Sequence, residues 1–499
     1  MGDSTGQATV LVMGAGIMGT GIAQVAAQAG HPVLLFDTHE KAAVEAKTRL
    51  QSTCDKLVAK GKFSEAEAAA MLAHVAPIDT LDAAASADLV IEAVVEDIEV
   101  KRQLFQQLEN IVASNCPLAS NTSSLSITAI ANGLRHPERL VGMHFFNPVP
   151  LMKLVEVVSG LQTSSEVAGA IHRLATAWGK HPVHARSTPG FIVNRIARPF
   201  YAETLALLQE RAATPPVIDA CLRGAGFRMG PCELMDLIGH DTNFAVTRSV
   251  YEANFFDKRY VPSLIQQELV DGGLLGRKSG RGFYDYSSES YRPADAKPLA
   301  AVVPSTAGLC VHGNGAIAEA FAATLAQHGC EFERDAHSDW IGLQAGDSRL
   351  QLGDGRCAGE LGKDSVVFDL PLAATAGSAL AWSHAQNVSA EWLEDAPRWL
   401  TLFGFSPRRI NDVPGLVVAR TVAMLINEAA DAVQQGVCDV AAADTAMKLG
   451  VNYPAGPFEW LARWDCGAVI ALLDRLDAHY RGERYRVSPW LRQKTWMNA

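Results

Sequence analysis

One glycine-rich turn limits the fold of the first part of the chain more than any other feature of the sequence. The apolar run Val10–Met13 leads directly into the turn Gly14–Gly19, which has the pattern G-x-G-x-x-G. A helical pattern follows, and a second apolar run, Val33–Phe36, then ends at Asp37. A strand, a glycine turn, a helix, a strand and an acidic residue in this order predict a βαβ unit whose turn binds a dinucleotide.

The three glycines and the acid predict which dinucleotide binds. Gly14 would make the tight turn, Gly16 would let the backbone approach a pyrophosphate, and Gly19 would let helix and strand pack closely. The helix N-terminus offers free N–H groups and a positive potential to the phosphates. Asp37 can accept hydrogen bonds from a ribose 2′-hydroxyl but would repel a 2′-phosphate, and residues 38–40 include no arginine. We therefore expect NAD rather than NADP.

Further apolar segments continue the alternation of strands and helices. They are Leu89–Ile91, Pro117–Ala119, Leu140–Met143 and Leu154–Val158. Near-continuous apolar strands separated by helical patterns, such as the helix expected over Ile98–Val112, predict a doubly wound and mostly parallel sheet. Ligands gather outside the carboxyl ends of the strands in such sheets, so polar residues that follow strands are candidates for the functional site.

Four polar residues are candidates for the functional site because of their positions relative to these strands and helices. Ser123 belongs to a polar turn after a strand, His144 follows the next apolar run, Glu156 interrupts an apolar strand, and Asn194 lies one turn into a helical segment. Singly, a histidine or such a turn has an ordinary structural explanation. A carboxylate inside an apolar strand is costly without a partner, and His144 would supply that partner. Beside a nicotinamide, the pair predicts a general base that takes a hydroxyl proton as hydride leaves the same carbon.

Several motifs together resemble the 3-hydroxyacyl-CoA dehydrogenase family. They are the glycine turn Gly14–Gly19, the N-T-S-S turn Asn121–Ser124, the run His144–Glu156 and the run Thr188–Arg195. The segment Gly276–Tyr286 is similar to the usual end of the family's sequence. The resemblance spans roughly residues 8–287.

The resemblance implies an activity and a role for each candidate residue. It implies oxidation of an (S)-3-hydroxyacyl-CoA to the 3-oxoacyl-CoA by NAD, without a metal. His144 is then the base, Glu156 orients it, and Ser123 and Asn194 contact the substrate oxygen. The contacts to NAD that the resemblance implies, besides the glycine turn, are Asp37, Glu96, Lys101, Ser123 and Asn147.

A basic stretch between residues 47 and 62 has two interpretations. Its cations are Lys47, Arg49, Lys56, Lys60 and Lys62. They can form a solvated helix face, or they can bind the phosphates of CoA. The resemblance implies CoA contacts at Lys56 and Lys60, and both interpretations stay open.

The C-terminal part of the chain repeats the first part. The residue pairs at an offset of 225 are Pro189 and Pro414, Arg195 and Arg420, Glu203 and Glu428, Asp219 and Asp444, and Arg259 and Arg484. At an offset of 299, Gly14, Gly19 and Gly30 correspond to Gly313, Ala318 and Gly329. A second, shortened dehydrogenase-like half therefore follows the first.

The second copy lacks the candidate chemistry. Ala419 stands where the first copy has Asn194, and neither N-T-S-S nor H-F-F-N-P occurs after residue 300. Position 336, which pairs with Asp37 at an unbroken offset, is alanine, although its neighbour is Asp335. We expect this half to pack rather than to catalyse, and we expect one NAD per chain.

The expected fold class is α/β plus all-α, in four domains. These are a Rossmann-type NAD-binding domain (1–186), a helical substrate and dimerisation domain (187–290), a degenerate, shortened Rossmann-like domain (305–405) and a second helical domain (406–499) that repeats 187–265. The segment Ser287–Pro304 is polar, has three prolines and is expected to be the linker. Family members with one copy generally dimerise through the helical domain, so we expect a homodimer or a pseudo-dimer within one chain.

Composition limits the partners and the compartment. The chain has 43 Lys and Arg against 54 Asp and Glu, a net charge of −11 that argues against nucleic acid as a partner. Nine cysteines without a C-x-x-C pair argue against a disulfide framework or a zinc site. The sequence shows no secretory leader pattern and no apolar run that could span a bilayer. We expect a cytoplasmic protein with no membrane partner.

Two other functions and two acyl chains stay as alternatives. A 2-hydroxyacid or sugar-acid dehydrogenase shares this domain order but often uses a lysine base, and a non-catalytic NAD-binding or scaffold protein needs no catalytic pair. The resemblance to duplicated family members of phenylacetate degradation implies 3-hydroxyadipyl-CoA, and 3-hydroxybutyryl-CoA is the competing substrate. The candidate partners of a distal carboxylate are Arg195, Arg198 and Arg228.

Overall fold

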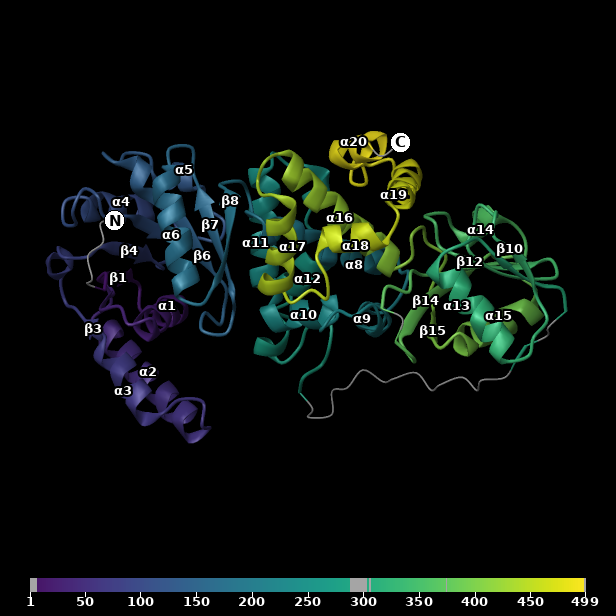
Figure 1. Ribbon diagram of the computed structural model, residues 1–499, viewed down its shortest axis with the longest axis horizontal. Helices are drawn as coiled ribbons and strands as arrows, with labels where there is room; N and C mark the ends of the chain where they lie inside the picture. Colours follow the sequence, from purple (N-terminus) through teal and green to yellow (C-terminus); the bar gives the residue numbers. More distant parts are fainter. Residues whose placement is uncertain (1–6, 288–302, 305–306, 374, 498–499) are drawn as a thin grey trace. The chain divides into compact units, whose positions relative to one another are not determined.

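The structure is a computed structural model that describes residues 7–287, 303–304, 307–373 and 375–497 (Figure 1). The chain divides into two units, of which the first comprises Met1–Arg195 with Gln435–Val451 and the second comprises Ile196–Gln434 with Asn452–Ala499. Most of the expected linker Ser287–Pro304, and the expected boundaries at residues 290 and 305, lie outside the described residues.

The first unit contains an eight-stranded sheet in the order β3-β2-β1-β4-β5-β6-β7-β8. The strands are β1 Val10–Met13, β2 Val33–Phe36, β3 Val75–Pro77, β4 Leu89–Glu92, β5 Leu118–Ser120, β6 Leu140–Phe145, β7 Leu154–Ser159 and β8 His181–Arg186. Neighbouring strands run parallel except β6 and β7, which are antiparallel. The predicted doubly wound sheet is confirmed.

Helices flank this sheet, and its central strands are buried because apolar residues point to both faces. The helices are α1 Ile17–Gln28, α2 Ala42–Ala59, α3 Glu65–Ala73, α4 Ile98–Leu108, α5 Ile127–Ile130, α6 Ser165–Ala177 and α7 Val193–Ile196. Helix α4 ends four residues before the expected Val112. Glu109, the residue after its end, accepts hydrogen bonds from the backbone N–H groups of Arg135 and His136.

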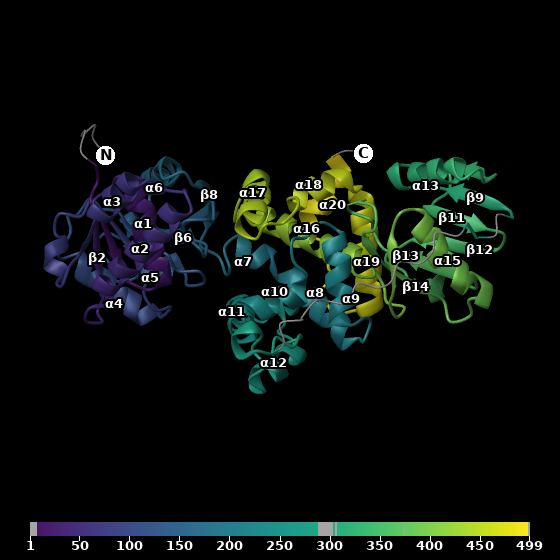
Figure 2. The same ribbon diagram turned by 90° about the horizontal axis from the view of Figure 1, so that it is seen from below.

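The second unit combines two sets of helices with a second sheet (Figure 2). Its helices of eight or more residues in the first set are α8 Arg198–Gln209, α9 Pro215–Gly224, α10 Pro231–Ile238, α11 His240–Ala253 and α12 Leu264–Asp271. The second set contributes α16 Val418–Gln434, α18 Pro457–Arg463, α19 Cys466–Tyr480 and α20 Pro489–Met497.

The second sheet has the order β10-β9-β11-β12-β13-β14-β15. The strands are β9 Leu309–His312, β10 Glu333–Asp335, β11 Gly342–Ala345, β12 Ser348–Leu352, β13 Ser365–Phe368, β14 Ala379–His384 and β15 Ser406–Arg409; the associated helices are α13 Ala316–Gln327, α14 Ala358–Leu361 and α15 Ala390–Leu402. Only its first βαβ unit, β9-α13-β10, reproduces the opening of the first sheet, since β11 then pairs antiparallel with β9.

The hydrogen bonds between β9 and β10 show which residue of the second copy is equivalent to Asp37, the acid that follows β2. Gly313 N donates to Asp335 O at 2.9 Å, and the first copy has the same bond from Gly14 N to Phe36 O at 2.8 Å. Ala336, the residue after Asp335, therefore has the place that the acid has in the first copy. The unbroken offset of 299 is confirmed for this turn.

Helices α8 and α16, one from each copy, pack together in the second unit, and each carries a glutamate that pairs with an arginine of the other copy. Glu203 on α8 accepts from Arg484 Nε at 2.9 Å and from the Tyr485 hydroxyl at 2.9 Å. The equivalent pair Arg259–Tyr260 donates to Glu428 on α16. Such a two-way exchange of the same contacts is typical of an isologous dimer interface. Here it lies within one chain.

The two copies also exchange a helix. Helix α17, Val440–Gly450, comes from the second copy and packs on β7 and β8 of the first sheet. The segment before it is bonded to the same sheet, since Arg186 N donates to Val437 O at 2.9 Å. The equivalent helix of the first copy, α9, packs on β14 of the second sheet. Each sheet is therefore covered in part by the other copy.

No helix among the described residues combines the length and the apolar character that a membrane span requires.

Candidate active site

In the glycine turn after β1, Gly14 and Gly19 have no room for a side chain, whereas Gly16 faces open space. A Cβ on Gly14, whose φ is +96°, would lie 2.4 Å from Ala93 O, and a Cβ on Gly19 would lie 1.8 Å from Gly14 O. A Cβ on Gly16 would meet no described atom within 4 Å. The open space at Gly16 faces the N-terminus of α1, which is the space that a pyrophosphate needs.

Asp37 follows β2 and is tied to the glycine turn. Its Oδ2 accepts from Ala15 N at 2.7 Å, and its Oδ1 accepts from His39 N at 2.9 Å. Arg49 of α2 also reaches the turn, because its Nη2 donates to Ala15 O at 2.9 Å. The sequence assigned Arg49 to the basic stretch 47–62, and its contact with the glycine turn was not expected because only residues 38–40 were considered near Asp37. The available signal was the basic face of the helix that follows.

His144 and Glu156 face each other across the antiparallel strands β6 and β7. His144 Nδ1 lies 2.6 Å from Glu156 Oε2, and the two residues are 6% and 0% exposed. Glu156 Oε1 accepts from Ile192 N at 2.9 Å and from Val193 N at 3.0 Å. One buried carboxylate therefore orients the imidazole and anchors the start of α7. Because Nδ1 is engaged, Nε2 is the ring nitrogen available to a ligand.

The second copy retains the anchor without the histidine. Asp369, after β13, is 0% exposed and accepts from Val417 N at 2.9 Å and from Val418 N at 2.6 Å. At an offset of 225, these two donors correspond to Ile192–Val193. Among the described residues, the donors to Asp369 are backbone N–H groups. The sequence analysis missed this likeness because Asp369 lies far from any matching motif.

The structure brings Ser123 and Asn194 together. Asn194 Nδ2 lies 3.4 Å from Ser123 O, although 71 positions separate them in the chain. The turn that carries Ser123 is also joined to the strand of His144, since Asn121 Oδ1 accepts from Phe145 N at 2.8 Å. Side chains that the sequence placed on three separate elements therefore lie around one edge of the sheet.

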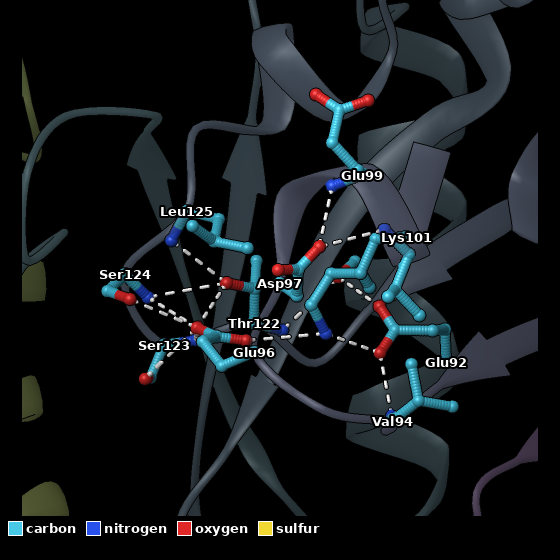
Figure 3. Close-up of polar contacts among 12 residues, drawn as sticks. Glu92, Val94, Glu96, Asp97, Glu99, Lys101, Thr122, Ser123, Ser124 and Leu125 are labelled. Atoms are coloured by element: carbon cyan, nitrogen blue, oxygen red, sulfur yellow. Dashed lines mark hydrogen bonds and ion pairs between the residues drawn. The ribbon is translucent and has the colours of Figure 1, made fainter. Parts of the chain in front are cut away.

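Glu96 holds the turn that carries Ser123 (Figure 3). Its Oε1 accepts from the Thr122 hydroxyl at 2.6 Å, from Ser123 N at 2.9 Å and from Ser124 N at 3.2 Å. Burial alone would raise the pKa of Glu96, but Lys101 and these donors outweigh it and hold the pKa below its usual value.

Lys101 lies inside the protein between two carboxylates. Its side chain is 1% exposed, and Nζ lies 2.5 Å from Glu92 Oε1 and 3.3 Å from Glu96 Oε2. The sequence analysis missed Glu92, although a glutamate at the end of the apolar run Leu89–Ile91 was a signal of the same kind as Glu156. The cofactor contact expected of Lys101 stays a prediction.

A cavity of about 210 Å³ lies between α1, α2 and the loop 147–150. Asn147 lines it, as do Arg49 and Thr53 of α2. Lys56 and Lys60 are exposed and continue the same face of α2, at helical spacing from Arg49 and Thr53. The basic stretch thus runs from this cavity into solvent.

The three arginines considered for a distal carboxylate are not brought together within one unit. Arg195 is in the first unit, is 4% exposed and donates to Gln435 Oε1 at 2.9 Å. Arg198 and Arg228 belong to the second unit. Arg198 is 6% exposed and stacks over Tyr201, with its guanidinium carbon 4.9 Å from the ring centre.

Models of three domain families match the chain. They are the 3-hydroxyacyl-CoA dehydrogenase NAD binding domain (residues 9–188), the 3-hydroxyacyl-CoA dehydrogenase C-terminal domain (190–286 and 415–498) and the 3-hydroxybutyryl-CoA dehydrogenase reduced Rossmann-fold domain (350–414). The chain is 43% identical over 492 residues to 3-hydroxyadipyl-CoA dehydrogenase of Escherichia coli, covering 98% of both chains. The chain belongs to the 3-hydroxyacyl-CoA dehydrogenase family.

Other members of the 3-hydroxyacyl-CoA dehydrogenase family match to different extents. A probable 3-hydroxybutyryl-CoA dehydrogenase of Bacillus subtilis is 42% identical over 56% of this chain and 98% of its own. The crystal structure of a 3-hydroxybutyryl-CoA dehydrogenase of E. coli has a TM-score of 0.88, with 42% identity and 99% of both chains covered. The chain is thus a dehydrogenase with an NAD-binding Rossmann domain, a helical C-terminal domain and a reduced Rossmann-fold domain.

Proposed function

We propose that this dehydrogenase oxidises (S)-3-hydroxyacyl-CoA to 3-oxoacyl-CoA at one site, in the first unit, with His144 as the base. The observation that carries the proposal is the buried pair of His144 and Glu156, whose second carboxylate oxygen anchors the backbone at Ile192 and Val193. The pair lies at the sheet edge that also presents Ser123. NAD, when bound, accepts the hydride from C3 of the substrate.

Each residue of the site has a task in this proposal. His144 Nε2 takes the proton of the 3-hydroxyl group, and Glu156 keeps the other ring nitrogen protonated and stabilises the imidazolium that forms. Ser123 and Asn194 hold the reacting oxygen, on which charge develops as the proton leaves. Their closeness in the structure supports a shared task.

The proposed cofactor is NAD. The open space at Gly16 and the acid at Asp37 fit a pyrophosphate and an unmodified ribose. The other proposed contacts are Glu96, Lys101, Ser123 and Asn147. Of these, Lys101 is the most enclosed, with a side chain that is 1% exposed and paired with two carboxylates.

The proposed substrate is an acyl-CoA with its CoA part along α2. Lys56 and Lys60 are exposed on the face that continues from the 210 Å³ cavity, which supports contacts with CoA phosphates. The relative named 3-hydroxyadipyl-CoA dehydrogenase matches over nearly the whole length of both chains and favours that substrate, in phenylacetate catabolism. The solved structure named 3-hydroxybutyryl-CoA dehydrogenase keeps the short acyl chain as the second candidate.

Replacing the base tests the reaction. We expect His144→Ala to lower kcat by at least about 10²–10⁴-fold and to leave NADH affinity nearly intact, because the glycine turn is separate. The control is His136→Ala, an exposed histidine before β6 that should leave kcat unchanged. Activity of His144→Ala within tenfold of the parent enzyme would contradict the assignment.

A panel of substrates tests the acyl chain. We expect 3-hydroxyadipyl-CoA to give a higher kcat/KM than 3-hydroxybutyryl-CoA, and we expect the 3-hydroxyhexanoyl ester, which has the same chain length without the carboxylate, to separate length from charge. A preference for 3-hydroxybutyryl-CoA would assign the short-chain activity instead.

The domain limits and the surroundings of the enzyme are proposals as well. We propose domains at 1–186, 187–290, 305–405 and 406–499, and a pseudo-dimer within one chain, which the reciprocal contacts of Glu203 and Glu428 support. We also propose a cytoplasmic location without a membrane partner, and the net charge of −11 argues against a nucleic-acid partner.

A further inference from the structure

Glu92 lies beneath both turns of the site. It is the last residue of β4 and pairs in register with Met13, the last residue of β1, and with Ser120, the last residue of β5. The glycine turn begins directly after Met13, and the turn that carries Ser123 begins directly after Ser120. Glu92 is 0% exposed, so it can act on cofactor or substrate only through other residues.

Each carboxylate oxygen of Glu92 is engaged. Oε1 accepts from Lys101 Nζ at 2.5 Å and from Val94 N at 2.8 Å, and Oε2 accepts from the Ser120 hydroxyl at 2.6 Å. The same Ser120 oxygen accepts from Thr122 N at 3.2 Å, which ties the beginning of the turn to Glu92. Removing the charge of Glu92 therefore disturbs a connected set of bonds rather than one contact.

Lys101 links Glu92 to Glu96, the carboxylate that accepts from the turn carrying Ser123. It lies one turn into α4, whose start is fixed because Asp97 caps the N–H groups of Glu99 and Val100 (Figure 3). Its ammonium is shared between Glu92 and Glu96. Without Glu92, the ammonium has Glu96 as its remaining carboxylate, and their closer approach would draw Glu96 away from the donors of the turn.

A buried ion pair of this kind is weak evidence of stabilisation, because apolar replacements of the same size are often as stable. It does hold a charge in one place. Lys101 holds Glu96 Oε2, while Glu96 Oε1 accepts from the turn that carries Ser123. The contribution expected of Glu92 is therefore to the geometry of the turn, and Glu92→Gln should also lower the free energy of unfolding because buried Lys101 loses one of its two counter-charges.

We infer that Glu92 is a positioning residue of the dehydrogenase: through Lys101 and Glu96, and through Ser120, it holds Ser123 at the reacting oxygen. This inference rests on the proposed role of Ser123. A displacement of Ser123 should slow the chemical step, while the enzyme should bind the acyl-CoA substrate nearly as tightly as before.

The test is a double-mutant cycle in the full chain with Glu92→Gln and Ser123→Ala. We expect Glu92→Gln to lower kcat about tenfold to a hundredfold, with KM for the acyl-CoA within about threefold. If Glu92 acts through Ser123, adding Glu92→Gln to Ser123→Ala should cost less than about threefold more. Glu99→Gln, an exposed charge removal on the same helix, is the matched control and should match the parent enzyme.

The outcomes separate the inference from the proposed function. If the losses in kcat from Glu92→Gln and Ser123→Ala multiply fully, or if Glu92→Gln raises KM for the acyl-CoA beyond about threefold, the role of Glu92 is overturned while the proposed role of Ser123 stays. A parent-like kcat for Ser123→Ala would overturn the proposed role of Ser123 and this inference with it. Should Glu92→Gln fail to fold, Ser120→Ala removes two of the bonds, to Glu92 and from Thr122 N, without removing charge, and the same cycle applies with a smaller expected loss.

Discussion

The Glu156 carboxylate both orients His144 and accepts from the backbone at the start of α7. The variant Glu156→Gln can separate these two roles. In Glu156→Gln the carbonyl oxygen can still accept from Ile192 and Val193, so the NH₂ group faces His144 Nδ1. That nitrogen must then accept, which moves the ring proton to Nε2 and leaves no base there. We expect kcat to fall by about 10³–10⁴-fold with little change in thermal stability. A loss of less than tenfold would show that the tautomer is not controlled by Glu156.

Asp37 and Arg49 both contact Ala15 and carry opposite charges, so we expect them to make opposing contributions to the choice between NAD and NADP. We expect the parent enzyme to prefer NAD. Asp37→Ser should improve kcat/KM for NADP relative to NAD by about tenfold or more, ~1.4 kcal/mol, since the anion is removed and the arginine remains. The double variant Asp37→Ser with Arg49→Met should lose that gain. Equal use of both cofactors by the parent enzyme would contradict the role given to Asp37.

At the scale of single residues, the sequence predicted the members of the site better than their partners. His144 and Glu156 could be paired because a carboxylate in an apolar strand requires a counterpart. Glu92 and Arg49 could not be given partners, since their contacts depend on the register of neighbouring strands and on the start of α4. A burial cost is visible in a sequence, whereas the group that offsets it is fixed only by the fold.

Among the elements, α8 and α16 each carry a glutamate whose side chain is 0% exposed and ion-paired with arginine. Burial raises the pKa of Glu203, but Arg484 and Arg420 outweigh burial and hold the pKa below its ordinary value. A lowered folded pKa gives stability that is present above the unfolded value, about 4.3, and is lost as the pH falls through the folded value. We expect denaturant unfolding to show this loss in acid.

Glu203→Gln tests that dependence. At pH 7 it should lower the free energy of unfolding by about 3 kcal/mol, because Arg420 and Arg484 lose a buried counter-charge. The variant should also lose less stability than the parent enzyme on going to pH 3. Glu210→Gln, where the carboxylate is partly exposed, is the control and should cost less than about 1 kcal/mol. Parallel pH curves for parent and Glu203→Gln would refute the assignment.

Apolar runs in the sequence predict the strands of the first sheet. The glycine turn, together with the alternation of strands and helices, predicts that the sheet is doubly wound and mostly parallel. The second sheet could be recognised only at its beginning. After β10 its strands alternate between parallel and antiparallel neighbours, and shortened strands with few apolar repeats carry no signal for that order. The helix exchange of α9 and α17 was also invisible, because an amphipathic helix does not specify which sheet it covers.

For the whole molecule, the structure and the reduced family model support one nucleotide site per chain. Helices α1 and α13 begin at equivalent residues, Ile17 and Ala316, yet Ala336 follows β10 where Asp37 follows β2. We expect calorimetry with NADH to give one site per chain. Ile17→Glu should abolish binding by repelling the phosphates, and the matched Ala316→Glu should leave the stoichiometry at one. Two sites per chain would contradict this.

Helix α17 is synthesised long after the sheet that it covers. The strands β1–β8 leave the ribosome early, but their cover at β7 and β8 is encoded after the whole segment Ile196–Gln434. At ordinary rates of translation that delay is roughly 10–50 s. During this interval the edge strand β8 has an unpaired row of backbone groups and is open to wrong partners. If the chain is released before α17 emerges, β8, the strand next to the one that carries Glu156, lacks the helix that covers it.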